Sequence, residues 1–356
     1  MHLPRRRKVP ARPQAIPDVS VVISVHDGEP FLAAALESLL TQEACDFEIV
    51  VVDDGSTDAT PETLATFRAR DARIVVETQP KRGLAEGLNR GIALARSPLV
   101  ARLDADDIAL PGRLARQVRF LEAHDQVGLV GGAVRFVDEQ GRPFGDWEYP
   151  LSDAEIRTAF AHTTPFAHSA VMLRKHAFEC AGGYRRAFTS ALDLDLWLRI
   201  AEGFGLANLP EPLVAYRVHP QQMTVRHLER QALEAVAARA ASRARAAGEP
   251  DPFEAGGSVD EATLLALGVG RDEIVTAFVE SATWLAKTLS RAGNGGAADA
   301  VFAEAGRRAR SGGGSPELVA RVHRERARRY AEQRRWLRAK LEEARAVRAE
   351  RTAPRA

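Results

Sequence analysis

Three aspartates follow an apolar segment in the first half of the chain. Residues 99–107 read LVARLDADD, so Asp104, Asp106 and Asp107 come directly after a run that is typical of a buried strand. Carboxylates gathered at such a point repel one another and are costly to desolvate. A divalent cation that carries phosphates would relieve this cost, and hard oxygen ligands suit Mg²⁺ or Mn²⁺. The alternative is that these residues only cap a turn, where Asp is common.

The segments around these aspartates alternate between strand and helix patterns. The expected strands cover residues 19–25, 47–52, 73–77 and 99–103. The expected helices between them cover residues 31–40, a segment from an N-cap at Thr60, and residues 83–96. This alternation predicts right-handed βαβ units and a mostly parallel sheet flanked by helices. In such sheets ligands bind at the carboxyl ends of the strands.

Polar side chains stand at three of those strand ends. Ser24 lies at the end of the first strand and Asp27 just after it, Asp54 follows the second, and Asp104 and Asp106 follow the fourth. Turn capping does not explain three convergent polar ends, so the pattern favours a ligand site. The sequence has no G-x-G-x-x-G after the first strand and no G-x-x-x-x-G-K-[ST], which argues against dinucleotide-binding proteins and P-loop NTPases.

Composition excludes several broad classes of protein. The 356 residues are 45% apolar and 27% charged, with a formal net charge of +1, so the molecule as a whole does not have the charge of a nucleic-acid binder. Two cysteines without a CxxC pattern indicate neither a disulfide framework nor a zinc site. No apolar run approaches the roughly 20 residues that span a bilayer. We therefore expect a cytoplasmic protein.

The composition changes along the chain and predicts three parts. Residues 1–18 are expected to be a flexible basic leader, residues 19–220 the α/β domain, and residues 221–356 a helical C-terminal region. Residues 296–309 predict one helix and residues 316–350 one long helix. From residue 321 onward there are 13 Arg and Lys against 5 Glu. This basic helix could attach peripherally to anionic lipid at the inner face of the membrane or to a protein partner, or it could simply pack one stripe on the domain.

Seven segments in order resemble one family. They are SVVISVHDGEPFLAAALESLLTQ, EIVVVDDGSTD, GLAEGLNRGIALARSPLVARLDADDIALPGRL, HSAVMLR, GGY, DLDLWLRI and YRVHP. Together they resemble a family 2 glycosyltransferase with the GT-A nucleotide-diphospho-sugar transferase fold, over about residues 18–220. The resemblance implies inverting transfer of a sugar from a nucleotide-diphosphate donor, usually a UDP-sugar, to a saccharide, lipid-linked or other hydroxyl acceptor. It also implies Mn²⁺ or Mg²⁺ as cofactor and a role in surface polysaccharide or glycoconjugate synthesis.

The resemblance also assigns residues to the donor. Asp54 resembles the carboxylate that accepts the hydrogen bond of the uracil imide, and Ser24 lies where the first strand meets the base. Asp104 and Asp106 match the DxD signature as metal ligands, with Asp104 turned toward the ribose. Arg82 lies where the family often has a basic residue near the base or the phosphates. Asp27 stands on the donor side, where the family usually has Asn.

The resemblance assigns the general base to Asp193. The family usually has Glu where this chain has Leu192, which removes a neighbouring charge that could orient the acceptor. Asp195 is a lesser candidate, with a surface or capping acid as the alternative. Trp197 sits on the apolar stripe of the same segment and is expected to pack in the core.

Three further residues are lesser candidates for the site. His219, in YRVHP, could contact metal or phosphate, as could Arg217. His168 could serve on the acceptor side, or it could be structural.

Two other functions stay open on the sequence. A catalytically weak nucleotide-sugar-binding scaffold would account for Leu192 and for the large helical region. A sugar-1-phosphate nucleotidyltransferase would need a Gly-rich, Arg-containing loop after the first strand, and HDGEPF is not one.

Overall fold

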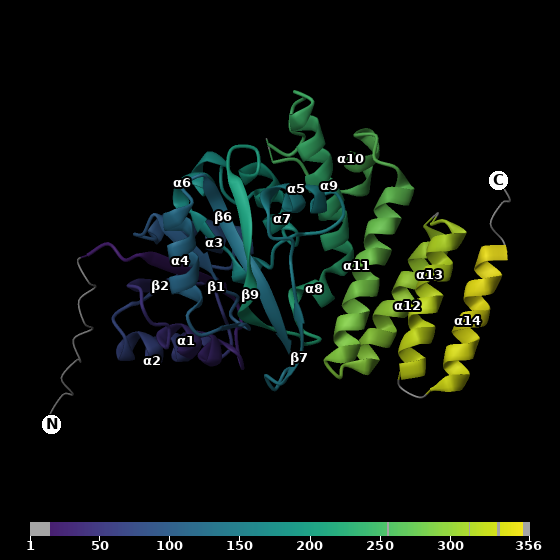
Figure 1. Ribbon diagram of the computed structural model, residues 1–356, viewed down its shortest axis with the longest axis horizontal. Coiled ribbons are helices and arrows are strands. Elements are labelled where there is room, and N and C mark those ends of the chain that lie inside the picture. Colours follow the sequence, from purple (N-terminus) through teal and green to yellow (C-terminus); the bar gives the residue numbers. More distant parts are fainter. Residues whose placement is uncertain (1–14, 255, 313, 333–334, 352–356) are drawn as a thin grey trace. The chain divides into compact units, whose positions relative to one another are not determined.

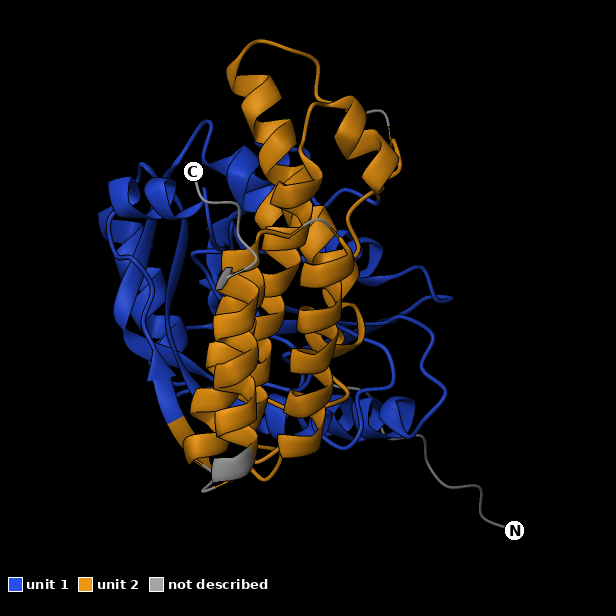
Figure 2. Ribbon diagram, turned by 90° about the vertical axis from the view of Figure 1, so that its right-hand side faces the viewer, with its two compact units in different colours: residues 1–136, 145–186, 196–217 blue, residues 137–144, 187–195, 218–356 orange. Residues whose placement is uncertain are grey.

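The computed structural model describes residues 15–254, 256–312, 314–332 and 335–351. The first 14 residues of the expected basic leader therefore lie outside the described residues. The chain forms two compact units, coloured separately in Figure 2. Unit 1 comprises residues 1–136, 145–186 and 196–217, and unit 2 comprises residues 137–144, 187–195 and 218–356.

Unit 1 is built on a sheet with helices along it (Figure 1). Its strands, two of which continue into unit 2, are β1 (Val19–Val25), β2 (Phe47–Asp53), β3 (Ile74–Thr78), β4 (Leu99–Arg102), β5 (Ile108–Ala109), β6 (Val127–Val137), β7 (Pro143–Trp147), β8 (Met172–Arg174) and β9 (Gly205–Arg217). Its helices are α1 (Leu32–Leu40), α2 (Thr60–Arg70), α3 (Leu84–Leu94), α4 (Arg113–Ala123), α5 (Asp153–Ala159), the 3₁₀ turn η1 (His168–Ala170) and α6 (Lys175–Cys180). Helix α7 (Leu192–Ile200) begins in unit 2 and ends in unit 1.

The strand order places four parallel strands side by side, β3, β2, β1 and β4. The order is β3-β2-β1-β4-β8-β6-β9-β5, with β7 beside β6. Strand β1 runs parallel to β2 and to β4, and β2 runs parallel to β3, as the alternating pattern predicts. The pairs β4–β8, β6–β8 and β5–β9 are antiparallel, so the sheet is mixed beyond β4. The carboxyl ends of β1, β2 and β4 therefore meet at one edge of the sheet.

The core of unit 1 lies between this sheet and its helices. All seven residues of β1 and of β2 are buried, as expected for strands covered on both faces. Helix α3 packs directly on β1 and β2. It approaches closely because it presents glycines: a Cβ on Gly91 would lie 2.5 Å from Cγ1 of Val22. The expected N-cap at Thr60 is wrong by one residue, because Ala59 is the N-cap and the Thr60 hydroxyl accepts the backbone N–H of Gly28 instead.

Unit 2 is mainly helical. Its helices are α8 (Met223–Arg226), α9 (Leu228–Ala246), α10 (Glu261–Ala266), α11 (Arg271–Arg291), α12 (Gly295–Ser311), α13 (Pro316–Glu332) and α14 (Trp336–Arg351). Helix α9 packs on α11, α11 on α12, α12 on α13, and α13 on α14 (Figure 1). Among the described helices, none is both long and apolar enough to span a bilayer.

The single long helix expected over residues 316–350 is wrong. The segment forms α13 and α14, which pack against each other. Nδ1 of His323 on α13 lies 2.5 Å from Oε2 of Glu342 on α14, and both side chains are buried. One straight helix would leave these groups apart and would expose the apolar stripe of its second half. Leu341 and Val347, two apolar residues of α14 that we expect to be buried on a helix that packs one apolar stripe, are instead about half exposed.

Candidate active site

The strand ends of unit 1 bring Ser24, Asp54 and Asp104 to one edge of the sheet. Ser24 pairs in register with Val52 of β2, two residues before Asp54. On the other side, Val22 pairs with Arg102 of β4, so Ser24 and Asp104 each come two residues beyond that pair. Ser24 is 8% exposed and lies under α3, where a Cβ on Gly87 would meet the serine Oγ at 2.1 Å. The close approach of α3 therefore depends on glycine and fixes the Ser24 side chain.

Asp54 holds the loop that follows β3. Its Oδ1 accepts the side-chain amide of Gln79 at 2.8 Å and the backbone N–H of Arg82 at 2.7 Å, and its Oδ2 accepts the N–H of Gly83 at 2.7 Å. A carboxylate has about four acceptor positions, so three of them are used within the protein. Recognition of a uracil imide by Asp54 would need the fourth. The Arg82 side chain itself is 58% exposed and lies 3.9 Å from Glu86.

Asp27 holds the loop after β2 in a similar way, by accepting hydrogen bonds from its backbone N–H groups. Its Oδ1 accepts the backbone N–H groups of Thr57 at 2.7 Å and Asp58 at 3.3 Å. The hydrogen bond from Thr57 is the main cause that lowers the pKa of Asp27 below its ordinary value. Asp27 adopts a positive φ of 53° at this point, and its side chain is 41% exposed. The structure thus gives Asp27 a loop-holding contact at the edge where the donor residues were expected.

Asp104 forms an ion pair with Arg102, which the sequence analysis missed. The guanidinium of Arg102 is buried and donates to Oδ1 of Asp104, whose side chain is 31% exposed. The backbone N–H of Asp104 donates to the hydroxyl of Ser169 at 2.9 Å. Burial is the largest single influence and by itself would raise the pKa of Asp104, but the charge and hydrogen bond of Arg102, together with His168 and Arg113, outweigh it, and the pKa lies below its usual range. Asp104 is therefore ionised at neutral pH.

A buried acid, Asp107, comes directly after the DxD segment. Asp107 is 2% exposed; its Oδ1 accepts the backbone N–H of Arg217, and its Oδ2 has no hydrogen-bond partner among the described residues. Burial, reinforced by the charges of Asp106 and Asp104, raises the pKa of Asp107 well above its ordinary value.

Arg113, also missed by the sequence analysis, is fully buried on α4. It donates to the carbonyls of Arg102 and Val171, at 2.6 and 3.2 Å. Burial lowers its pKa to about 9, so it remains a cation at neutral pH. A sequence signal for Arg102 existed, since it is a lone charge within the apolar run of β4. Arg113 carries none, because arginine is ordinary in the first turn of an amphipathic helix.

Arg217 and His168 both lie beside the aspartate segment in unit 1. Nε of Arg217 donates to the backbone carbonyl of Asp106 at 2.9 Å, and its guanidinium stacks over the ring of Phe31 at 4.7 Å. His168 places Nε2 2.8 Å from the hydroxyl of Tyr184. Burial and the charge of Arg102 lower the pKa of His168 to about 3, so the ring is neutral at physiological pH.

The donor set suits a metal that arrives with phosphates. Among the described residues no group of three or more His, Cys, Asp or Glu side chains converges as a closed metal site. Mg²⁺ and Mn²⁺ commonly use one or two carboxylates and complete their shell with substrate phosphates and water. The partly exposed Asp106 and the ionised Asp104 fit such an open site.

The expected catalytic residues at the start of α7 belong to unit 2. Asp193 is partly exposed, whereas Leu192 and Asp195 are 2% and 1% exposed. A surface position for Asp195 is therefore wrong. Further along α7, in unit 1, Trp197 is fully buried with its ring 6.3 Å from that of Phe166, which confirms the expected core packing.

His219 also belongs to unit 2. It is 7% exposed, and its backbone N–H donates to Oε1 of Gln222 at 2.9 Å. The expected contact of His219 with metal or phosphate stays a prediction.

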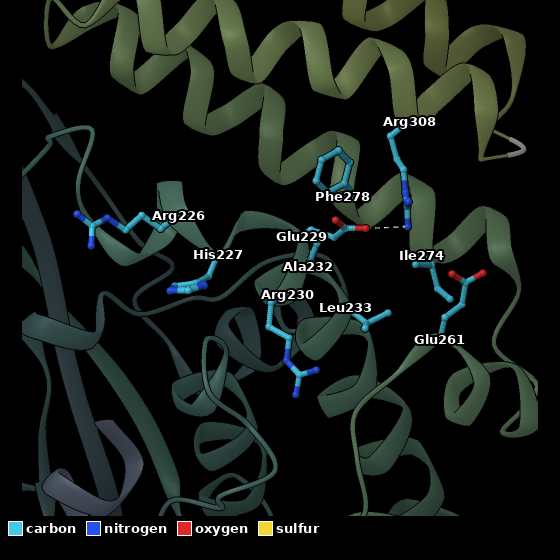
Figure 3. A pocket seen from close by; sticks show the side chains of 10 residues that line it. All are labelled: Arg226, His227, Glu229, Arg230, Ala232, Leu233, Glu261, Ile274, Phe278 and Arg308. Atoms are coloured by element: carbon cyan, nitrogen blue, oxygen red, sulfur yellow. Dashed lines mark ion pairs between the residues drawn. The ribbon is translucent and has the colours of Figure 1, made fainter. Parts of the chain in front are cut away.

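Unit 2 also contains a hollow of about 470 Å³ (Figure 3). Two of its lining arginines are engaged in ion pairs. Arg308 lies 3.0 Å from Glu229, the pair drawn in Figure 3. Arg230 points away from that pair and forms an ion pair with Glu234. The hollow therefore presents much less positive charge than its arginines suggest.

Sequence comparisons with known proteins support the family resemblance over most of unit 1. Residues 20–182 match the family described as glycosyl transferase family 2. The putative glycosyltransferase EpsE of Bacillus subtilis is 34% identical over 206 residues, covering 56% of this chain and 73% of that protein. The amylovoran biosynthesis glycosyltransferase AmsE of Erwinia amylovora is 37% identical over 202 residues, covering 56% of this chain and 75% of that protein.

Solved structures share the fold over nearly the whole chain. The mannosyltransferase PcManGT of Pyrobaculum calidifontis, solved with GDP-Man and Mn²⁺, has a TM-score of 0.53 at 19% identity and covers 95% of this chain and 90% of its own. Residues 1–349 of S. aureus TarS give a TM-score of 0.51 at 15% identity, covering 92% and 90%. These likenesses establish the GT-A fold. With the sequence matches to EpsE and AmsE, they lead to one conclusion: this chain is a glycosyltransferase and belongs to glycosyl transferase family 2.

Proposed function

We propose that this enzyme transfers a sugar, with inversion, from a nucleotide-diphosphate donor to an acceptor hydroxyl during polysaccharide synthesis. The observation that carries the proposal is the convergence of Ser24, Asp54 and the Asp104–Asp106 pair at the carboxyl ends of adjacent parallel strands. Relatives named for amylovoran and O-antigen biosynthesis support the polysaccharide role.

Donor binding is assigned to unit 1. Asp54 and Ser24 would face the nucleobase, Asp104 the ribose, and Asp106 the metal-bound diphosphate. Arg82, exposed on a loop that Asp54 fixes, would face the phosphates. We propose UDP as the nucleotide, because Asp54 can accept from a uracil imide; the neighbour TarS was solved with UDP-GlcNAc, and PcManGT with GDP-Man. A bound Mn²⁺ or Mg²⁺ would stabilise the negative charge that develops on the departing diphosphate.

Catalysis is assigned to Asp193. The acceptor oxygen forms a bond to the anomeric carbon while its proton moves to the Asp193 carboxylate. The bond from the anomeric carbon to the diphosphate oxygen breaks, and its electron pair leaves with the nucleoside diphosphate. A positioned carboxylate contributes roughly 10²–10⁴-fold to such a step. The partial exposure of Asp193 is compatible with access by an acceptor.

A nucleotide-sugar-binding scaffold is the second candidate, and one observation favours it. Leu192, beside the proposed base, is buried and apolar, so it offers no second carboxylate to orient an acceptor. Tight binding without turnover would be the mark of a scaffold.

One experiment separates the two. The full chain is incubated with a panel of UDP-, dTDP-, GDP- and ADP-sugars, with Mn²⁺ or with chelator, and the released nucleoside diphosphate and the thermal midpoint are both measured. A transferase is expected to release UDP from one donor only when metal is present. Thermal stabilisation by UDP without turnover across donors and acceptors would support the scaffold instead.

A further inference from the structure

We infer that Glu234, on α9, is a positioning residue for Asp193. It holds the backbone that leads into α7, the helix that carries the proposed base. The inference rests on the catalytic role proposed for Asp193, and it adds a residue of the C-terminal helical region to the machinery of the transfer.

The Glu234 carboxylate binds three successive backbone groups. Its Oε2 accepts the N–H groups of Thr189 at 2.8 Å, Ser190 at 2.7 Å and Ala191 at 2.9 Å. Its Oε1 accepts the hydroxyl of Thr189 at 2.9 Å. Three consecutive N–H groups aimed at one oxygen form a concave anion site, here filled by a side chain from 43 residues further along the chain.

This contact leads directly into the first turn of α7. The carbonyl of Ala191 accepts the backbone N–H of Asp195 at 3.2 Å, which closes the turn that contains Asp193. Glu234 therefore sits one hydrogen bond away from the turn that sets the direction of the Asp193 side chain. A negative charge beside the N-terminus of a helix is also favourable for the helix dipole.

The carboxylate is itself fixed in place. Glu234 is fully buried, on the same face of α9 as the small buried residues Ala237, Ala238 and Ala241. Arg230, one turn earlier, donates to Glu234 and, at 2.7 Å, to the carbonyl of Val259. An acid on an otherwise apolar face is costly to bury unless it is paired, and here Arg230 and the segment that leads into α7 supply the partners.

The position of Asp193, held in this way, should affect the rate of sugar transfer more than the affinity for the donor. The proposed base must meet the acceptor hydroxyl at hydrogen-bond distance, and a displacement of about 1 Å can cost roughly 10²-fold in rate. The donor contacts assigned above belong to other residues. Loss of Glu234 should therefore lower kcat and leave donor affinity almost unchanged.

The test compares three variants of the full chain. Glu234→Ala removes every contact, and kcat is expected to fall roughly 10- to 100-fold with donor Kd within about twofold. Glu234→Gln retains one oxygen that can accept the three N–H groups, and is expected to keep kcat within about fivefold of the wild type. Glu229→Gln is the matched control: it removes an exposed acid from the same helix and should leave kcat unchanged.

Amide hydrogen exchange supplies a readout that does not need turnover. In Glu234→Ala, exchange at Thr189, Ser190 and Ala191 is expected to rise at least about tenfold, with little change in Glu229→Gln. If Glu234→Ala loses stability but keeps wild-type kcat at a temperature where it is folded, Glu234 is merely structural and the inference is overturned. If the wild type has no turnover at all, the proposed function fails separately, and unchanged exchange in Glu234→Ala would then overturn the positioning role by itself.

Discussion

The substitution Asp54→Asn tests how the nucleotide edge is built. In the wild type the Asp54 carboxylate accepts the backbone N–H groups of Arg82 and Gly83 and the side-chain amide of Gln79. Asparagine keeps the shape but has only one acceptor oxygen. Its NH₂ group would face a backbone N–H, so at least one donor of the loop would lose its partner.

The size of the effect follows from where the donors lie. A buried donor without a partner costs about 1–3 kcal/mol. Asp54 is 3% exposed, but Arg82 and Gly83 lie on the exposed side of the contact, where water can partly replace the lost acceptor. We therefore take the lower half of the range, about 1–2 kcal/mol, which corresponds to roughly a 5- to 30-fold rise in local opening.

Two measurements follow, with Gln79→Ala as the control. Amide exchange at Arg82 and Gly83 should rise in Asp54→Asn by the factor above, and much less in Gln79→Ala, which leaves both backbone bonds in place. Calorimetric affinities for UDP and CDP give the second measurement. If Asp54 also accepts the uracil imide, Asp54→Asn should weaken UDP about tenfold more than CDP, which lacks that donor.

Each part of this reasoning can fail separately. Unchanged exchange at Arg82 and Gly83 would show that Asp54 does not hold the loop. Equal losses of UDP and CDP affinity would show that Asp54 acts only through the loop, and would remove it from base recognition.

Three further predictions concern metal, base and pH. Asp106→Ala should make UDP affinity the same in Mn²⁺ and in chelator while the thermal midpoint holds; persistent metal dependence in calorimetry would move the metal elsewhere. Asp193→Asn should lower kcat roughly 10²–10⁴-fold with donor Kd unchanged, and a variant that turns over normally would contradict the assignment of the base. Burial alone would raise the pKa of Glu342, but the hydrogen bond with His323 and nearby arginines outweigh it, and the pKa is lowered. The stabilisation is then present above about pH 4.3, the unfolded value, and is lost as pH falls through the folded pKa. Glu342→Gln should flatten this acid loss in unfolding experiments; an unchanged pH profile would assign it to other groups.

Periodicity along the chain was sufficient for much of unit 1. The strand expected at residues 19–25 is β1 as observed, and those at 47–52, 73–77 and 99–103 shift by a single residue at their ends. Continuous apolar runs bounded by Gly, Pro and Asp are local signals, and a strand buried on both faces needs little else to be recognised. The polar strand ends could be expected to meet for the same reason, since parallel strands share one carboxyl edge.

Contacts between segments that lie far apart in the sequence could not be predicted from periodicity. Nothing in the spacing of residues 316–350 showed that two helices would form, because their formation depends on α13 and α14 packing against each other. The mixed sheet beyond β4 likewise depends on which strands can reach an open edge.

The features of the candidate site also divide into those that can be predicted from the sequence and those that require the folded structure. The family, the DxD aspartates and the acid at the start of α7 could be identified from the chain alone, because these residue types lie within short contiguous motifs. Folding was needed to reveal that Arg102 pairs with Asp104, that Asp54 uses three acceptor positions on a loop, and that Glu234 binds the approach to α7. The physical reason is that the charge and hydrogen bonding of a buried group depend on the partners that folding brings to it, and these partners can be tens of residues away in the chain.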